Sequence, residues 1–183
     1  QRREDRGRHE PEGLFDARYL AIEDSGRIWI GRIDDFGYLA TDDGAVWRYV
    51  SVSQGSAGVA SDWKGWRAAR AIGGSVFFCG DDGVVEWRDD RESAHWAWDG
   101  FVFDVFRIDS RTFMVTDYPV VVELFDDGTM KKVPEPLEII GFSEVYHANP
   151  TPDRSAVVMA SPAFGVVRFD GARFERIPIR GDA

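Results

Sequence analysis

The chain has 183 residues, of which 44% are hydrophobic and 30% are charged, and it contains seven Trp and thirteen Phe. This composition is typical of a folded globular domain and excludes a chain that is disordered throughout. The net charge is −10 and no Lys/Arg-rich run lies beyond the first eight residues, so we expect no nucleic-acid partner.

The first 13 residues are charged and lack any strand pattern. They predict a polar linker or tail, and residues 14–183 are predicted to form the folded segment. No apolar run in the chain reaches the ~20 residues that a membrane helix needs.

Residues 14–52 carry the pattern of four short strands. A strand ending at Ile22 is followed by the turn EDSG, the apolar strand RIWIG and the alternating strand FGYLA. The turn Asp43-Gly44 then precedes the last strand. Short alternating runs separated by Asp, Gly and Ser predict antiparallel hairpins.

The same pattern recurs over residues 66–98, 101–134 and 141–179, after a long connection at 52–65. The first strands of these three units are predicted to end at Ile72, Ile108 and Tyr146. Asp-Gly turns occur 84 and then 43 residues apart, which is two periods followed by one; they begin at Asp43, Asp127 and Asp170.

Four strands in about 43 residues is the size of a β-propeller blade. The sequence therefore predicts an all-β fold, a β-propeller with about four consecutive four-stranded antiparallel blades that form part of a larger ring. A β-sandwich would account for the number of strands but not for the regular period.

The segment EDSGRIWIGRIDDFGYLA, from Glu23 to Ala40, combines an acidic-Gly turn, an aliphatic-Trp-aliphatic-Gly strand and a second Gly strand. It resembles the two-component regulator propeller repeat. The matching positions are Asp24, Gly26, Ile28, Trp29, Ile30, Gly31, Gly37 and Leu39. The last unit, which closes on FDGARF, is similar to the late-blade form of this family, whereas the two middle units lack the Trp-x-Gly signature.

The resemblance implies the periplasmic, ligand-binding part of a bacterial inner-membrane sensor, followed in that family by a histidine kinase or a diguanylate cyclase. On this hypothesis the partners are a small molecule, such as a carbohydrate, and the remaining blades and signalling domains of the full-length protein. Because ring closure covers the outer faces of end blades, an open row of four blades is also expected to self-associate.

A candidate ligand site follows from strand direction. Successive strands alternate in direction, so the loops between second and third strands and the links between blades emerge at one rim. The candidate residues there are Asp34, Asp35, Trp63, Trp66, Asp81, Asp82, Asp117 and Tyr118. The carboxylates could accept hydrogen bonds from sugar hydroxyls or bind Ca²⁺, and the two Trp could stack on a ring. Alternatively, the Asp residues only stabilise turns and the two Trp fill the gap between blades.

The other Trp residues fall on predicted strands and are expected in the core: Trp29, Trp47, Trp87, Trp96 and Trp98. Cys79 is the only cysteine, which excludes an intrachain disulfide, and it is expected to be buried. His147 lies near a channel-lining strand and would have no acidic partner in the loops.

No catalytic-triad order, phosphate loop or metal-binding spacing occurs in the sequence, so no cofactor, metal site or catalytic residue is predicted. The sequence favours a non-enzymatic, ligand-sensing propeller segment of a signal-transduction protein. A protein-interaction or structural propeller is the alternative, and a propeller lyase or hydrolase that lacks part of its ring is a third interpretation.

Overall fold

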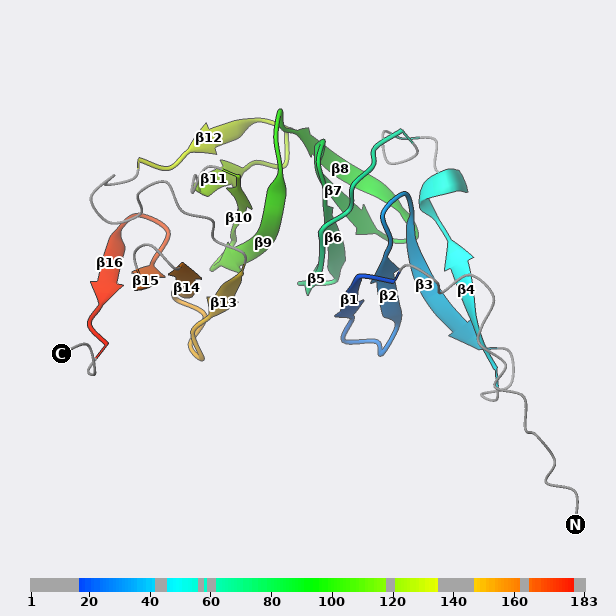
Figure 1. Ribbon diagram of the computed structural model, residues 1–183, viewed down its shortest axis with the longest axis horizontal. Coiled ribbons are helices and arrows are strands. Elements are labelled where there is room, and N and C mark those ends of the chain that lie inside the picture. The colour runs from blue at the N-terminus through cyan, green and yellow to red at the C-terminus, as the bar shows by residue number, and fades with distance from the viewer. Residues whose placement is uncertain are drawn as a thin grey trace, which may run out of the picture.

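The computed structural model describes residues 17–41, 46–55, 58, 62–117, 121–134, 147–161 and 165–179. These residues form four antiparallel sheets of four strands, which stand side by side in one row (Figure 1). In each sheet the strands are neighbours in chain order. The predicted all-β propeller architecture is thereby confirmed.

The strands divide into four blades. Blade one comprises β1 (Tyr19–Ile22), β2 (Ile28–Gly31), β3 (Phe36–Thr41) and β4 (Trp47–Ser51), and a short 3-10 helix, η1 (Ser53–Gly55), follows it. Blade two comprises β5 (Ala68–Ile72), β6 (Ser75–Cys79), β7 (Gly83–Arg88) and β8 (Arg91–Ala97). Blade three comprises β9 (Val102–Ile108), β10 (Arg111–Thr116), β11 (Val121–Leu124) and β12 (Met130–Lys132). Blade four comprises β13 (Ala148–Pro150), β14 (Val157–Ser161), β15 (Gly165–Phe169) and β16 (Phe174–Ile177).

The first strand of blade four lies later in the chain than predicted. We expected it to end at Tyr146, which is outside the described residues, as are residues 1–13 and the turn Asp43-Gly44. Instead β13 ends at Pro150, because the amide of Thr151 donates to the carbonyl of Ala156 at 2.9 Å and closes the hairpin to β14.

The first strands β1, β5, β9 and β13 lie next to one another along the inner side of the row. Since strand direction alternates within each blade, two rims result. We call the rim with the second-to-third-strand loops and the blade links the link rim; it is at the top of blades one to three in Figure 1. The opposite rim, with the turns between first and second and between third and fourth strands, is the hairpin rim.

Neighbouring blades bury their facing sheets at three junctions. Blade two has a neighbour on each side, so all five residues of β6, SVFFC, are buried. An unbroken apolar run is the pattern expected of a strand covered on both faces. Val76 and Phe78 face blade one at junction 1–2, whereas Phe77 and Cys79 face blade three at junction 2–3. Junction 3–4 is built around Phe106, Phe113 and Phe169.

The outward face of blade one is less covered than its inward face. Tyr19 and Ala21 pack into junction 1–2, while Leu20 and Ile22 on the opposite face of β1 are 57% and 58% exposed. The expectation that Trp47 lies in the core is wrong. Trp47 is 44% exposed, because strand register places it on this same outward face, opposite Thr41.

The remaining core predictions hold more closely. Trp29, Trp87 and Trp96 are buried, Trp98 is half-buried at junction 2–3, and Cys79 is completely buried. Burial is the main cause that raises the pKa of the Cys79 thiol well above its usual value. Among the described residues, no helix is long and apolar enough to cross a membrane.

Candidate functional site

The acids of blade one at the link rim have different surroundings. Asp34 is exposed, whereas Asp35 is buried. The Asp35 carboxylate accepts hydrogen bonds from the hydroxyls of Tyr49 and Ser51, both at 2.9 Å. The Ser53 hydroxyl donates a third, at 2.5 Å. Burial, followed by the Asp35 charge, raises the pKa of Tyr49 far above its usual value. Asp35 therefore fastens the end of β4 to the loop before β3, and its oxygens are occupied by the protein itself.

The acids of blade two lie against the link from blade one. The Asp81 carboxylate pairs with the Arg67 guanidinium at 2.5 Å, and the Asp82 carboxylate accepts from the amide of Lys64 at 3.1 Å. Gly65 has a φ of +67°, and a Cβ there would run into the Asp81 carboxylate. Glycine in the link thus lets the acid of the neighbouring loop approach the backbone. Asp81 is half-buried, while Asp82 remains exposed.

Blade three repeats this arrangement. Asp117 is half-buried, its amide donates to the carbonyl of Phe101 at 2.9 Å, and a Cβ at Gly100 would meet its carboxylate. Gly100 also has a positive φ, of +141°. Tyr118 lies outside the described residues.

The two Trp residues of the first blade link take different places. Trp66 is 2% exposed and packs edge-on against Phe36 at junction 1–2, with ring centroids 5.0 Å apart. Trp63 is half-buried, and its ring lies 6.5 Å from that of Trp66 and 5.9 Å from that of His95. Trp66 therefore fills the gap between blades, and only Trp63 retains an accessible ring surface.

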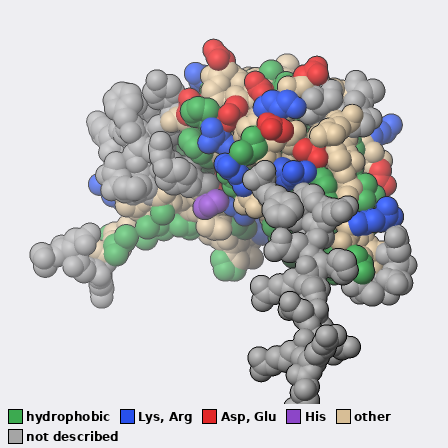
Figure 2. Space-filling model, turned by 45° about the vertical axis from the view of Figure 1, so that its right-hand side comes forward, with side chains coloured by type: hydrophobic (Ala, Val, Ile, Leu, Met, Phe, Trp, Pro, Cys, Tyr) green, Lys and Arg blue, Asp and Glu red, His purple; other side chains and the backbone are tan. Residues whose placement is uncertain are grey.

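Phe101 and Arg67, two residues at the link rim, were not among the predicted site residues. Phe101, in the link between blades two and three, is 42% exposed, and the Arg67 guanidinium lies over its ring at 4.2 Å. The sequence did offer a signal for Phe101: it lies in a link between blades, as Trp63 does. Figure 2 shows acidic and basic side chains interleaved over the upper part of the molecule, as expected for a surface held by ion pairs such as Arg67 to Asp81.

A buried carboxylate on the inner strands was also missed. Asp104 on β9 is completely buried and accepts two hydrogen bonds from the Arg70 guanidinium of β5, at 2.7 and 2.6 Å. The amide of Ala148, at the start of β13, donates to it at 2.9 Å. This one side chain therefore ties blades two, three and four together, and its hydrogen bond raises the pKa of Arg70.

His147 has an acidic partner that comes from a strand instead of a loop. Its Nδ1 lies 3.7 Å from the Asp104 carboxylate, and its side chain is 66% exposed. The pair gives an accessible imidazole beside a buried carboxylate. Within the part of the chain that the structure describes, no group of three His, Cys, Asp or Glu side chains is arranged to hold a metal ion.

No protein-family model and no curated protein sequence matches the chain. Several solved structures are similar to it. A streptogramin B lyase is similar with a TM-score of 0.66 and 11% identity, over 90% of this chain and 55% of the lyase chain. A catalytically inactive His-to-Ala variant of virginiamycin B lyase from Staphylococcus aureus, solved with quinupristin, has a TM-score of 0.60 and 10% identity, over 85% of this chain and 55% of that chain.

A sensor domain is similar to the same degree. The extracellular domain of BT4673 from B. thetaiotaomicron, described as a hybrid two component system, matches with a TM-score of 0.63 and 9% identity, over 88% of this chain and 22% of that chain. The chain thus spans about half the length of the lyases and about a fifth of the sensor domain. At these identities the likeness shows the fold alone: the chain has the architecture of a β-propeller.

Proposed function

We propose that this chain is the ligand-sensing propeller segment of a bacterial signal-transduction protein, placed in the periplasm and without catalysis of its own. Its ligand is a small molecule such as a carbohydrate, bound at the link rim. The observation that carries the proposal is the exposed Phe101, 42% accessible: its ring lies under the Arg67 guanidinium that pairs with Asp81, and its carbonyl accepts from the amide of Asp117.

The chemistry of this surface suits a hydroxyl-rich ligand. An exposed aromatic ring packs against the apolar face of a sugar, and carboxylates accept hydrogen bonds from its hydroxyls. Arg67 covers one side of the Phe101 ring and neutralises Asp81, so the ring keeps its orientation. Asp34, Asp82 and Trp63 would extend the surface along the rim. Asp35 and Trp66 are buried, and the proposal leaves them out.

Two further features support the sensor interpretation. The fold is similar to an extracellular domain of a two-component system, and the first blade resembles the repeat of such sensors. The exposed Leu20, Ile22 and Trp47 also form an apolar face on blade one that another blade would cover, as blade two covers the opposite face. The remaining blades of a longer ring are the proposed partner there.

A binding experiment with matched variants tests the ligand site. Calorimetric titration with a panel of mono- and oligosaccharides should reveal a ligand, and Phe101→Ala should abolish its binding. Phe125→Ala is the control, because Phe125 is similarly exposed at 38% but lies in the turn between β11 and β12, on the hairpin rim. Failure of every sugar to bind, or an equal loss in both variants, would contradict the proposal.

A lyase is the second candidate, and one observation favours it: His147 lies 3.7 Å from Asp104, and a lyase of the same fold loses activity when a histidine is replaced. Incubation with quinupristin followed by chromatography tests this function. Consumption of quinupristin by the chain, lost in His147→Ala, would favour the lyase, whereas the sensor proposal expects no consumption.

A further inference from the structure

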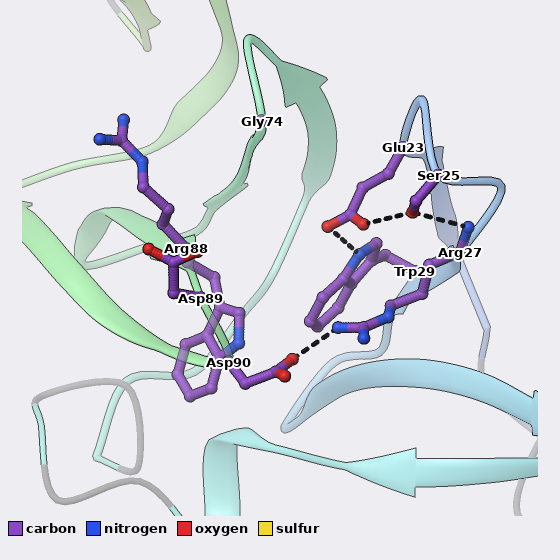
Figure 3. A pocket seen from close by; sticks show the side chains of 9 residues that line it. Glu23, Ser25, Arg27, Trp29, Gly74, Arg88, Asp89 and Asp90 are labelled. Atoms are coloured by element: carbon purple, nitrogen blue, oxygen red, sulfur yellow. Dashed lines mark hydrogen bonds and ion pairs between the residues drawn. The ribbon is translucent and has the colours of Figure 1, made fainter.

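A polar cavity of about 240 Å³ lies between blades one and two on the hairpin rim (Figure 3). Its walls come from the turn between β1 and β2, the turn between β5 and β6, and the turn between β7 and β8. The lining residues that carry polar or aromatic side chains are Glu23, Ser25, Arg27, Trp29, Trp87, Arg88, Asp89 and Asp90. None of them belongs to the link rim.

The two arginines of the cavity are already neutralised by the protein. Arg27 of blade one pairs with Asp90 of blade two at 2.5 Å, which closes one side of the cavity across the blades (Figure 3). Arg88 pairs with Glu86 at 2.6 Å and donates to Ser75 at 2.7 Å. Neither guanidinium is left to attract an anionic ligand.

The carboxylates in the wall are held by weaker partners. Glu23 accepts from the indole of Trp29 at 2.8 Å and from the Ser25 hydroxyl at 2.9 Å, both uncharged donors. Asp89 is exposed and adopts a φ of +51° in the two-residue turn between β7 and β8. Each carboxylate oxygen has lone pairs for more than one donor, so this wall can accept further hydrogen bonds from a ligand.

One donor in the wall has no acceptor. Trp87 is 5% exposed and lines the cavity, and its indole Nε1 has no hydrogen-bond partner among the described residues. A buried N–H without an acceptor is unfavourable, so a group that accepts there would be stabilised. The other cavity indole, Trp29, is already satisfied by Glu23.

We propose that this cavity binds a single neutral sugar ring. A hydroxyl is the group that can both accept from the Trp87 N–H and donate to Glu23 and Asp89. An anion would face these carboxylates with both arginines already paired, and an ammonium group would offer no acceptor to the indole. The volume lies just below the range of about 300–1,000 Å³ that is usual for drug-sized ligands, which suits one ring. The site is independent of the function proposed for the link rim.

Indole N–H signals in a ¹⁵N–¹H correlation spectrum of the full chain test the proposal directly. D-glucose, D-galactose and D-mannose are each titrated into the protein, and Trp87→Phe identifies the Trp87 signal. We expect at least one hexose to shift this signal along a saturable curve. The indole N–H of Trp98 is also buried without a hydrogen-bond partner among the described residues but lies at junction 2–3, so its signal is the internal control and should not move.

A matched pair of variants then locates the sugar. Asp89→Asn should weaken the apparent affinity about tenfold, as expected when a charged hydrogen-bond acceptor is lost. Asp109→Asn should leave it unchanged, since Asp109 has nearly the same backbone conformation, a φ of +54°, in the turn between β9 and β10. Asn tolerates this conformation as Asp does. No saturable shift with any hexose, equal shifts of all indole signals, or equal effects of the two variants would overturn the proposal.

Discussion

Junction 1–2 and junction 2–3 hold neighbouring blades by different means. At junction 1–2 the rings of Phe36 and Phe78 stack with centroids 3.9 Å apart, and Trp29 and Trp66 meet Phe78 edge-on. The ion pair that crosses this junction, Arg27 to Asp90, is exposed to solvent. Junction 2–3 contains more aliphatic side chains, and a buried carboxylate, Asp104, closes its inner edge.

The comparison shows what each kind of packing leaves behind. Flat rings that meet edge-on bury much area but do not fill space evenly, and junction 1–2 has both the cavity of Figure 3 and two buried indole N–H groups without partners among the described residues, those of Trp66 and Trp87. Junction 2–3 also has one such indole N–H, that of Trp98, but its buried ion pair satisfies Arg70 and depends on the single charge of Asp104. We therefore expect junction 1–2 to be destabilised most by the removal of ring volume, and junction 2–3 by the removal of the Asp104 charge.

The largest effect is expected from breaking the ring packing of junction 1–2. Phe78→Ala removes a side chain that is completely buried among three other rings. Because lost contacts and the remaining cavity both count, we expect a loss of about 3–5 kcal/mol in the free energy of unfolding. Chemical denaturation measures it. Phe78→Leu, which retains most of the volume, should lose less, and an equal loss would contradict packing as the cause.

Breaking the charge of junction 2–3 comes next. Asp104→Ala leaves the Arg70 guanidinium without its partner, and removing one member of a buried ion pair costs about 3–5 kcal/mol. Arg70 is one-third exposed, so we expect the lower end, about 3 kcal/mol. The double variant Arg70→Met/Asp104→Leu should recover most of this stability in the same denaturation assay. A double variant no more stable than the single one would show that the charge is not the cause.

A buried carboxylate whose hydrogen bonds come from hydroxyls, with the Arg32 guanidinium 4.0 Å away, sharpens the comparison. Asp35→Asn presents an amide N–H₂ to hydroxyls that donate to the native carboxylate, so we expect a loss of about 1–3 kcal/mol. Asp82→Asn, at the neighbouring loop, should change stability by less than about 0.5 kcal/mol because Asp82 is exposed. Thermal melts distinguish the two. Equal melting temperatures for both variants would argue against a structural role for Asp35.

The smallest effect concerns an ion pair at junction 3–4, and it depends on pH. Arg111 pairs with Glu123 at 2.6 Å and donates to the carbonyl of Gly171 in blade four at 2.9 Å. The hydrogen bond from Arg111 holds the pKa of Glu123 below its usual value. A lowered folded-state pKa stabilises the protein above the unfolded pKa, about 4.3, and this contribution is lost as pH falls through the folded-state pKa.

Glu123→Gln should therefore destabilise the protein by up to about 1 kcal/mol at pH 7, since the Arg111 side chain is 43% exposed and solvent screens the pair. Melting temperatures of the two proteins should converge as the pH is lowered below 4. A difference that stays constant over this range would show that the Glu123 charge is not responsible.

Much of the fold could be predicted because its pattern is local. Alternation of apolar residues within five- or six-residue runs, with Asp and Gly between them, specifies hairpins without reference to distant residues. Turn chemistry is equally local: Asp89 and Asp90, which form the turn between β7 and β8, both adopt the left-handed conformation that a two-residue hairpin loop requires. The period of these turns then indicated blades.

The tertiary structure decided which face of each strand was covered and which acids met a cation. Trp47 and Trp29 look alike as strand residues, yet only Trp29 faces blade two. Asp35 stood in a predicted loop and became buried, while Asp104, inside an apolar strand, came to join three blades through Arg70 and Ala148. Arg70 and Asp104 are 34 residues apart in the chain. The sequence by itself determined the blades, because hairpins depend on neighbouring residues; only packing decided the junctions and the cavity, because burial and charge pairing depend on side chains that the chain brings together from different blades.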